Sequence, residues 1–262
     1  MMKIRITHLG TASVILEIGG VRVITDPVFD PAGSRYKWAP VGGSSTKTEG
    51  PLVPVETIGA FDAALVSHAQ HEDNLDRAGR AALASARRVL TTRASARRLG
   101  GHAEGLAEWE TAEIAGADGT RVRVTATPAR HGPPLSLPFV GKVIGFILEW
   151  DGQDRGPLYI SGDTVVFGGL AKIAARYRVG VALLHMGQAK LPITGPFRLT
   201  MDAAGAAHAT KLLGAHTVVP LHYDGWTHFS EPREAAVAAF ETAGVTDRVR
   251  WLPKGTPVEL DV

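Results

Sequence analysis

The stretch SHAQHEDNLD, Ser67–Asp76, follows directly on the short apolar run Phe61–Val66. The run is typical of a buried strand, and the residues after the polar stretch have the spacing of a helix. The polar stretch therefore lies at the carboxyl end of a strand, the edge where layered α/β folds build their sites. Imidazole and carboxylate groups are ligands that zinc and its neighbours prefer. We therefore predict that His68, His71 and Asp73 bind a metal ion.

Three later segments supply further candidate ligands, each where a strand-like run ends. VRVTATPARH ends at His131, PLYISGD ends at Asp163, and TVVPLH ends at His222. Taken alone, His131 is equally consistent with an ordinary loop, and Asp163 is a suitable N-cap for a helix that begins near Phe167. Together with the histidine turn, however, the three segments indicate one metal-binding constellation.

These residues resemble the metallo-β-lactamase superfamily, in particular the branch of the ascorbate-phosphate lactonases and the N-acyl-phosphatidylethanolamine phospholipase D enzymes. The resemblance covers nearly the whole chain. THLGTASVILEIGGVRVITDPVFD, Thr7–Asp30, is similar to that branch's opening hairpin and Asp-Pro turn, and the resemblance ends with PLHYDGW, Pro220–Trp226. It implies an α/β fold, a four-layer αββα sandwich, in a single domain over residues 1–262.

The histidine turn departs from the family's pattern, which is His, any residue, His, any residue, Asp, His, then commonly Leu-Asp. We favour the alignment that keeps the ending DNLD, residues 73–76, and places an insertion between His68 and His71. An ungapped alignment from His68 would instead put Gln70 and Glu72 in ligand positions.

A second departure is Asn74, which stands where the family has a histidine. A neutral amide oxygen is a much weaker zinc ligand than imidazole. The resemblance implies two metal positions with different ligand sets. The first set is His68, His71 and His131, with Asp163 nearby. The second is Asp73, Asp163, His222 and at best Asn74. We expect one tight zinc site and a second site that is weak or empty, or that accepts manganese or iron.

The chemistry that such a site supports is hydrolysis, because a divalent cation lowers the pKa of bound water to about 7. Asp73 is the candidate catalytic residue, which orients that water and accepts its proton. Tyr223 and His228 are candidates for contacting substrate, although a packed aromatic ring and a surface imidazole fit the sequence equally well. By analogy with the nearest branch, we expect a small-molecule substrate with an ester-like bond, either a lactone or a phosphodiester.

Two further histidines and two loops lie near this constellation in the sequence. We expect His185 to be structural and His8 to support the site through a hydrogen bond. The loops Asp30–Pro51 and Lys190–Thr200 are candidate walls of a substrate pocket. Their side chains that suit this role are Tyr36 and Trp38 in the first loop, and Phe197 and Arg198 in the second.

The charge pattern supports an alternative function. Seven arginines and no acid lie between Arg77 and His102. Such a patch is able to bind nucleic acid, and the wider superfamily contains metal-dependent nucleases. The net charge of only +2 argues against strong sequence-independent binding. A third reading is a catalytically degenerate ligand-binding protein, which the insertion and Asn74 would mark. The retained Asp73, Asp163 and His222 argue against it.

Length and composition agree with one soluble domain. A chain of 262 residues with 45% hydrophobic content buries a large core. No apolar run approaches the roughly 18 residues of a membrane span, and the amino terminus lacks the pattern of a secretory signal. Cysteine is absent, so thiolate ligands are excluded. We expect a cytoplasmic protein from a bacterium.

The hydrophobic pattern predicts hairpins first and then alternating strands and helices. Strands are predicted near residues 3–8, 13–18 and 21–25. Helices are predicted for Met201–Ala215, with Thr200 as the cap, and for Glu231–Gly244, with Ser230 as the cap.

Overall fold

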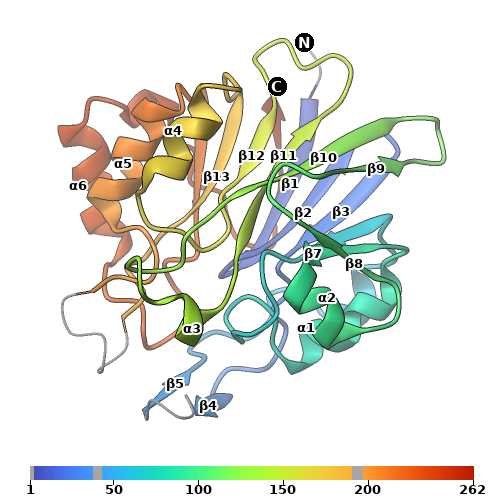
Figure 1. Ribbon diagram of the computed structural model, residues 1–262, viewed down its shortest axis with the longest axis horizontal. Coiled ribbons are helices and arrows are strands. Elements are labelled where there is room, and N and C mark those ends of the chain that lie inside the picture. The colour runs from blue at the N-terminus through green and yellow to red at the C-terminus, as the bar shows by residue number, and fades with distance from the viewer. Residues whose placement is uncertain (1–2, 38–42, 191–196) are drawn as a thin grey trace.

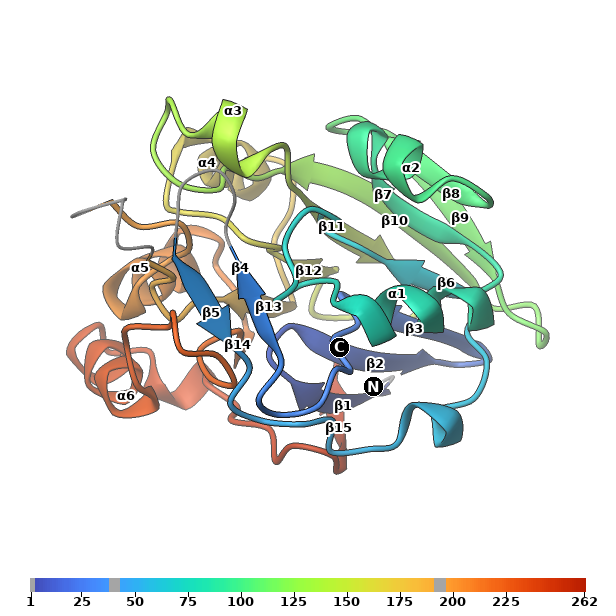
Figure 2. The same ribbon diagram turned by 90° about the horizontal axis from the view of Figure 1, so that it is seen from below.

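The computed structural model of the protein describes residues 3–37, 43–190 and 197–262. Two mixed β-sheets of seven and six strands form its centre, and helices lie on their outer sides (Figure 1). The view from below in Figure 2 separates the layers, with α4, α5 and α6 on one side and α1 and α2 on the other. The predicted α/β architecture is confirmed.

The first sheet begins with the predicted amino-terminal hairpins. Its strands, in order across the sheet, are β15 (Pro257–Asp261), β1 (Lys3–Gly10), β2 (Ser13–Ile18), β3 (Val21–Thr25), β6 (Ala63–Leu65), β7 (Val89–Thr92) and β8 (Ala103–Leu106). Neighbours pair antiparallel from β15 to β3 and parallel from β3 to β8. The chain therefore changes from hairpins to strand-helix units just before the histidine turn.

The second sheet also combines both kinds of pairing. Its order is β14 (Thr217–Leu221), β13 (Val181–His185), β12 (Leu158–Ile160), β11 (Ile144–Glu149), β10 (Arg121–Pro128) and β9 (Thr111–Ala115). The strands β12, β13 and β14 are parallel, and β9 to β12 are antiparallel. As a result β10, β12, β13 and β14 all end at the same edge. His131, Asp163 and His222 follow β10, β12 and β14 there, and His185 is the last residue of β13.

Three hydrophobic clusters hold the four layers together. The largest joins the facing sides of the two sheets and includes Leu16, Val124 and Phe146. A second cluster joins the outer side of the second sheet to α4 (Gly168–Ala174), α5 (Ala203–Leu212) and α6 (Arg233–Thr242). The third joins the outer side of the first sheet to α1 (Arg77–Ala82), α2 (Arg93–Leu99) and the 3₁₀ helices η1 (Val55–Thr57) and η2 (Leu83–Ser85). Burial of these apolar faces supplies the main driving force for the sandwich.

The helix starts differ from the predicted ones. Asp202 caps α5, because its carboxylate accepts a hydrogen bond from the backbone N–H of Gly205. Thr200 instead accepts a hydrogen bond from the backbone of Ala189. The first helical turn of α6 has no side-chain cap, and Ser230 donates to the carbonyl of Gln188. Both predicted caps are therefore wrong, since each side chain has a tertiary partner.

The predicted long loop contains a short hairpin of β4 (Arg35–Lys37) and β5 (Ser44–Thr46). The hairpin packs on the loop after β14, where the Tyr36 and Trp226 ring centroids lie 5.5 Å apart.

Trp38 and residues 191–196 lie outside the described residues. Two short elements complete the chain, α3 (Leu137–Val140) and the 3₁₀ helix η4 (Thr246–Arg248). No helix in the described ranges is long and apolar enough to cross a membrane.

Candidate metal centre

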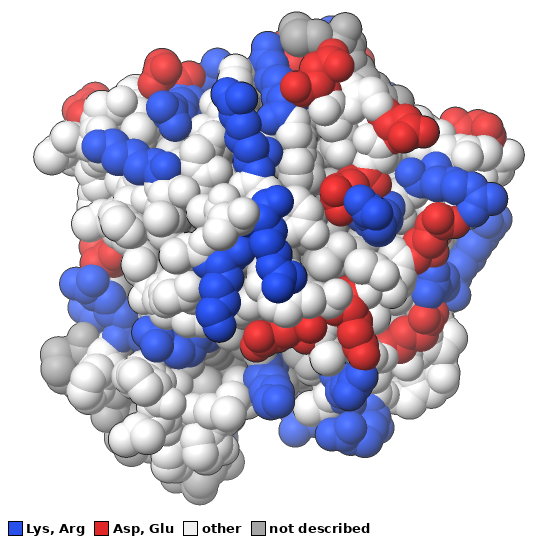
Figure 3. All heavy atoms as spheres, turned by 45° about the horizontal axis from the view of Figure 1, so that its top comes forward, with Lys and Arg blue, Asp and Glu red and all other residues white. Residues whose placement is uncertain are grey.

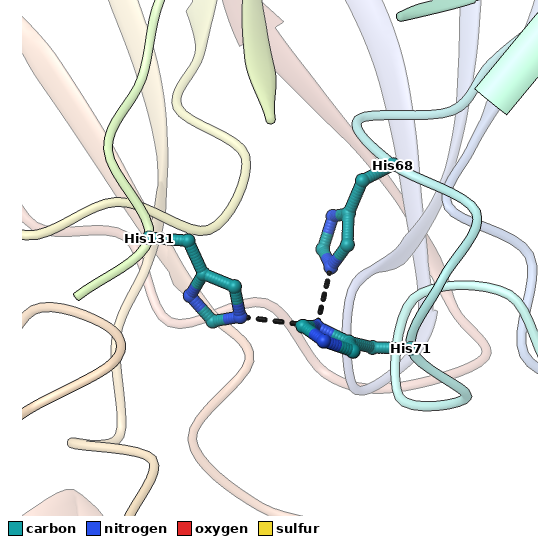
Figure 4. A group of neighbouring side chains, drawn as sticks. All are labelled: His68, His71 and His131. Carbon is teal, nitrogen blue, oxygen red and sulfur yellow. Dashed lines mark hydrogen bonds between the residues drawn. The ribbon is translucent and has the colours of Figure 1, made fainter. Parts of the chain in front are cut away.

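Three histidines from two different sheets meet at the end of the sandwich. His68 and His71 come from the turn after β6, and His131 follows β10 (Figure 4). His71 Nδ1 lies 3.0 Å from His68 Nε2 and 3.1 Å from His131 Nε2. One nitrogen from each ring therefore points to a common centre, and these atoms lie within 4.8 Å of one another. This cluster is called the three-histidine position below.

The surroundings of the three-histidine position fix the rings in a metal-binding form. The Nδ1–H of His131 donates to the carbonyl of Leu199 over 2.7 Å, which leaves the lone pair of Nε2 free for the cluster. Burial lowers the pKa of His71 to about 4 and the pKa of His68 well below its ordinary value. These two imidazoles are therefore neutral at pH 7, which is the form that binds metal ions.

A second group, called the aspartate position below, consists of Asp73, Asp163 and His222, which follow β6, β12 and β14. His222 Nε2 lies 3.3 Å from Asp73 Oδ2, and His222 Nδ1 lies 3.6 Å from Asp163 Oδ1. The two positions are adjacent, because Asp163 Oδ2 is 3.8 Å from His131 Nε2. All six predicted ligands thus lie in two neighbouring triads.

Several polar atoms of the aspartate position lack hydrogen bonds. Both ring nitrogens of His222, Asp163 Oδ2 and the amide oxygen of Asn74 are buried and have no hydrogen-bond partner within the described part of the chain. A buried polar atom without a partner costs about 1–3 kcal/mol. One nitrogen of His222 and the neighbouring carboxylate oxygens fit a divalent cation, because each residue is able to offer it one ligand atom.

The charges of the aspartate position lead to the same conclusion. Burial raises the pKa of Asp73, but the nearby His222 and His228 outweigh it and hold that pKa well below its usual value. Burial lowers the pKa of His222, but Asp163 and Asp73 outweigh it and raise that pKa to about 9. At pH 7 the His222 imidazolium therefore offsets only one of the two carboxylate charges, so the group keeps a net negative charge. A metal ion bound here takes the place of that proton.

Positive φ angles occur at His222, in the aspartate position, and at Thr11, which it contacts. Among the described residues other than glycine, positive φ angles occur at Thr11, Asp26, Gln188 and His222, with Trp109 as the fifth case. The backbone N–H of His222 donates to the carbonyl of Thr11 over 2.9 Å, and His8 Nε2 lies 3.2 Å from the same oxygen. His8 thus contacts the carbonyl that holds the His222 backbone, and its supporting role stays a prediction. Strain of this kind persists where the surrounding structure over-determines it.

Asp26, from the opening Asp-Pro turn, supports the site in a way that sequence reasoning missed. Its Oδ1 accepts a hydrogen bond from the backbone N–H of Ser67 over 2.7 Å and so fixes the start of the histidine turn. Its Oδ2 lies 3.5 Å from His185 Nε2. His185 is fully buried, and its ring centroid is 5.5 Å from that of His222. Asp26 and His185 thus contact each other next to the ligand His222, in keeping with the structural role expected for His185.

The two predicted substrate contacts have different environments. The Tyr223 ring packs in a T-shaped arrangement on Trp251, with ring centroids 5.4 Å apart, in the cluster that includes α6. The structure does not bring this ring to the triads, and a substrate contact of Tyr223 stays a prediction. His228, in contrast, is not a surface imidazole, because its side chain is 7% exposed and its Nε2 lies 3.0 Å from Asp73 Oδ2.

Comparisons with known proteins agree with this fold. The family model described as a beta-lactamase superfamily domain matches residues 21–223. A UPF0173 metal-dependent hydrolase of Methanosphaerula palustris is 31% identical over 262 residues, which cover 98% of this chain and all of the relative. A second one, of Rubrobacter xylanophilus, is 29% identical over 84% of this chain and 81% of its own length.

Solved structures share the fold at lower identity. The isothiocyanate hydrolase from Delia radicum gut bacteria has a TM-score of 0.79 at 21% identity and covers 97% of this chain and 98% of its own. Igni18, a metallo hydrolase of Ignicoccus hospitalis, has a TM-score of 0.70 at 24% identity, with both chains covered completely. Both the family model and the 31% identical relative extend over most of the chain. The chain therefore belongs to the metallo-β-lactamase superfamily, within the UPF0173 family of metal-dependent hydrolases.

Proposed function

We propose that this metal-dependent hydrolase cleaves an ester-like bond, a lactone or a phosphodiester, in a small-molecule substrate. The observation that carries the proposal is the meeting of two adjacent triads, one of three imidazoles and one of two carboxylates and an imidazole. Such neighbouring positions suit hydrolysis, because they are able to bind both the attacking water and the substrate oxygen.

The two positions are proposed to differ in metal and in affinity. His68, His71 and His131 would hold zinc tightly, since three neutral imidazoles match its preference. Asp73, Asp163 and His222 form a harder set that would bind zinc weakly or accept manganese or iron. The finer placement in the lactonase and phospholipase D branch belongs to the same proposal and rests on the opening and closing motifs.

Asp73 is the proposed catalytic residue. A bound divalent cation lowers the pKa of water to about 7 and polarises a carbonyl or phosphoryl oxygen. The depressed pKa keeps Asp73 ionised at neutral pH, so its carboxylate is able to orient the attacking water through a hydrogen bond. His228 contacts the same carboxylate and restricts its orientation. In this proposal Asp73 accepts the proton of the attacking water and then passes the same proton to the leaving group.

Among the described residues, no contact favours the nucleic-acid alternative. Arg88 forms an ion pair with Glu104 over 2.6 Å, Arg87 forms one with Asp62 over 3.3 Å, and Arg93 pairs with Glu110. Acids from outside the arginine-rich segment thus neutralise part of it. On the face in Figure 3, basic and acidic side chains are also interspersed. A ligand-binding protein that has lost its metal is disfavoured, because the buried polar atoms of the aspartate position would then have no partner that compensates for their burial.

The experiment combines metal analysis with a substrate panel. Protein purified without added metal is analysed by plasma mass spectrometry as wild type, His131→Ala, Asp163→Ala and, as the matched control, the exposed His208→Ala. We expect about one equivalent of zinc in wild type and control, and its loss in both site variants. Lactones, bis-p-nitrophenyl phosphate and an isothiocyanate are then assayed with manganese supplementation. Absence of bound metal even after reconstitution, or two equally tight zinc ions, contradicts the proposal.

A further inference from the structure

The aspartate position has an additional imidazole beside it. His228 lies in the loop after β14, six residues beyond His222, and its Nε2 approaches Asp73 Oδ2 at 3.0 Å. His222 Nε2 lies 3.3 Å from the same carboxylate oxygen. Two imidazole nitrogens from different parts of one loop therefore converge on a single oxygen of the aspartate position. The 3.0 Å separation fits a hydrogen bond and equally fits two atoms that share one metal ion at bond lengths of about 2 Å.

A neighbouring hydroxyl holds the His228 ring in place. Ser45 Oγ, on β5, lies 2.5 Å from His228 Nδ1. A serine hydroxyl is able to accept a hydrogen bond from Nδ1–H, which leaves the Nε2 lone pair directed at the aspartate position. Metal-binding histidines usually donate their other ring N–H to a partner of this kind. The pairing of Ser45 with His228 therefore has the form of a ligand and its supporting residue.

The β4–β5 hairpin brings Ser45 next to His228, although the two residues are far apart in the sequence. The backbone N–H of Thr46 donates to Thr227 Oγ1, and the backbone N–H of Thr227 donates to the carbonyl of Thr46, each over 3.0 Å. An isolated bridge also joins Lys47 to Trp226. These contacts fix the residues on both sides of Ser45 and His228, so the position of the ring is built into the fold.

Asn74 is the competing candidate for a fourth ligand. Its amide N–H donates to Asp163 Oδ1 over 3.3 Å, and its amide oxygen is buried without a partner in the described chain. An amide oxygen is a weaker ligand than an imidazole nitrogen for zinc and for the later first-row metals. Asn74 is therefore better suited to orienting Asp163 than to binding the metal ion itself.

We propose that His228 is the fourth protein ligand of the aspartate position, beside Asp73, Asp163 and His222. The inference rests on the proposed metal centre and concerns only its second ion. The donor set then consists of two imidazoles and two carboxylates instead of one imidazole and two carboxylates. Such a mixed set suits zinc and iron better than magnesium or calcium, which prefer sites made of oxygen atoms alone. The aspartate position remains the harder and weaker of the two, but it is a complete four-ligand site.

The first experiment measures metal affinity rather than activity. Zinc binding to wild type, His228→Ala and His208→Ala is followed by chelator competition. At saturating zinc we expect two equivalents in wild type and control, one bound tightly and one bound weakly. In His228→Ala the weaker equivalent should lose more than about 100-fold in affinity, beyond the usual effect of removing a supporting residue. The tight equivalent should be unchanged, which also shows that the variant is folded. If His228→Ala does not fold, the closer isostere His228→Asn replaces it.

A rescue variant distinguishes between two roles of His228, a metal ligand and a residue that only positions Asp73. Asn74→His places an imidazole next to Asp163, which the Asn74 amide contacts over 3.3 Å. Combined with His228→Ala, it should restore the weaker equivalent, because the missing fourth ligand is supplied again. If His228 merely holds Asp73 in place, the added imidazole leaves that defect uncorrected. Failure of the rescue would then count against His228 as a ligand.

Cadmium NMR gives the direct readout. With ¹¹³Cd at both positions and ¹⁵N-labelled histidine, each coordinating nitrogen shows a scalar coupling to the metal. We expect coupling at His68, His71, His131, His222 and His228. Three results would overturn the inference while the proposed function stands. They are an unchanged affinity for the second metal in His228→Ala, absence of the fifth coupling, and binding of only one equivalent by wild type at saturating metal. Absence of metal from the three-histidine position overturns the proposed function itself.

Discussion

The two halves of the metal centre differ in where their parts come from. Two of the three imidazoles of the three-histidine position come from one short turn, and His131 completes it. The aspartate position collects Asp73, Asp163 and His222 from three strand ends, and its surroundings include Ser45 on a distant hairpin. One turn thus supplies two of the three ligands of the three-histidine position, whereas each ligand of the aspartate position comes from a different segment and is supported by loops far apart in the chain. The following predictions test this contrast.

The largest effect is expected from His71→Ala. His71 is the ring that both other imidazoles of the three-histidine position approach, so its loss removes the centre of that cluster. We expect loss of the tight zinc and a fall of activity to background, at least about 1000-fold, as expected when an essential catalytic group is removed. Plasma mass spectrometry and steady-state kinetics measure both, with His208→Ala as the control. Retention of tight zinc in this variant would contradict the contrast.

A smaller effect is expected from Asp73→Asn, which keeps the size of the side chain but removes its charge. We expect kcat to fall by about 10²–10⁴-fold, the usual contribution of a general acid or base. The tight zinc should remain, because Asp73 does not belong to the three-histidine position. Parallel metal analysis and kinetics test the separation. Simultaneous loss of both metals would show that the two positions do not act independently.

The pH dependence of metal binding should distinguish the two positions further. The pKa of His222 is raised to about 9, so below pH 9 a metal ion must displace a proton from the aspartate position. Its affinity should therefore fall by about tenfold per unit as pH decreases from 9 to 7. The pKa of His71 is lowered to about 4, so the three-histidine position should show little change over that range. Chelator competition at several pH values measures both. Parallel pH slopes for the two positions would refute this prediction.

The smallest effect is expected from Ser45→Ala, which removes the hydroxyl behind His228. Loss of a supporting residue usually costs about 10–100-fold in metal affinity. We expect a decrease at the lower end of this range, because water is able to replace the hydroxyl, and only at the weaker equivalent. Ser44→Ala, on the same hairpin, is the matched control. A decrease confined to the tight equivalent would reverse the assignment of the two positions.

The fold and the six ligand candidates could be predicted because their signals are local. The strands β1, β2 and β3 follow short hydrophobic patterns, and the candidate ligands stand where such patterns end. Parallel strands then bring Asp163 and His222 to one edge without further information. The comparisons confirm the superfamily, whereas the metal, the substrate, the single-domain organisation and the cytoplasmic location stay predictions.

The remaining features depend on contacts that no local pattern encodes. Ser230 and Thr200 are good caps by residue type, but tertiary partners engage both of them. The place of His228 beside Asp73 depends on the β4–β5 hairpin, within a segment whose composition predicted only a loop. Asp26 was recognised as part of a turn, but its hydrogen bond to Ser67 requires the pairing of β3 with β6.

The most direct measurement is anomalous diffraction at the zinc absorption edge from crystals grown with limiting and with excess zinc. We predict one peak among His68, His71 and His131 at limiting zinc. At excess zinc, a second and weaker peak should follow beside Asp73, Asp163 and His222. A first peak at the aspartate position, or no peak at either triad, would contradict the claim that the chain builds two unequal metal positions.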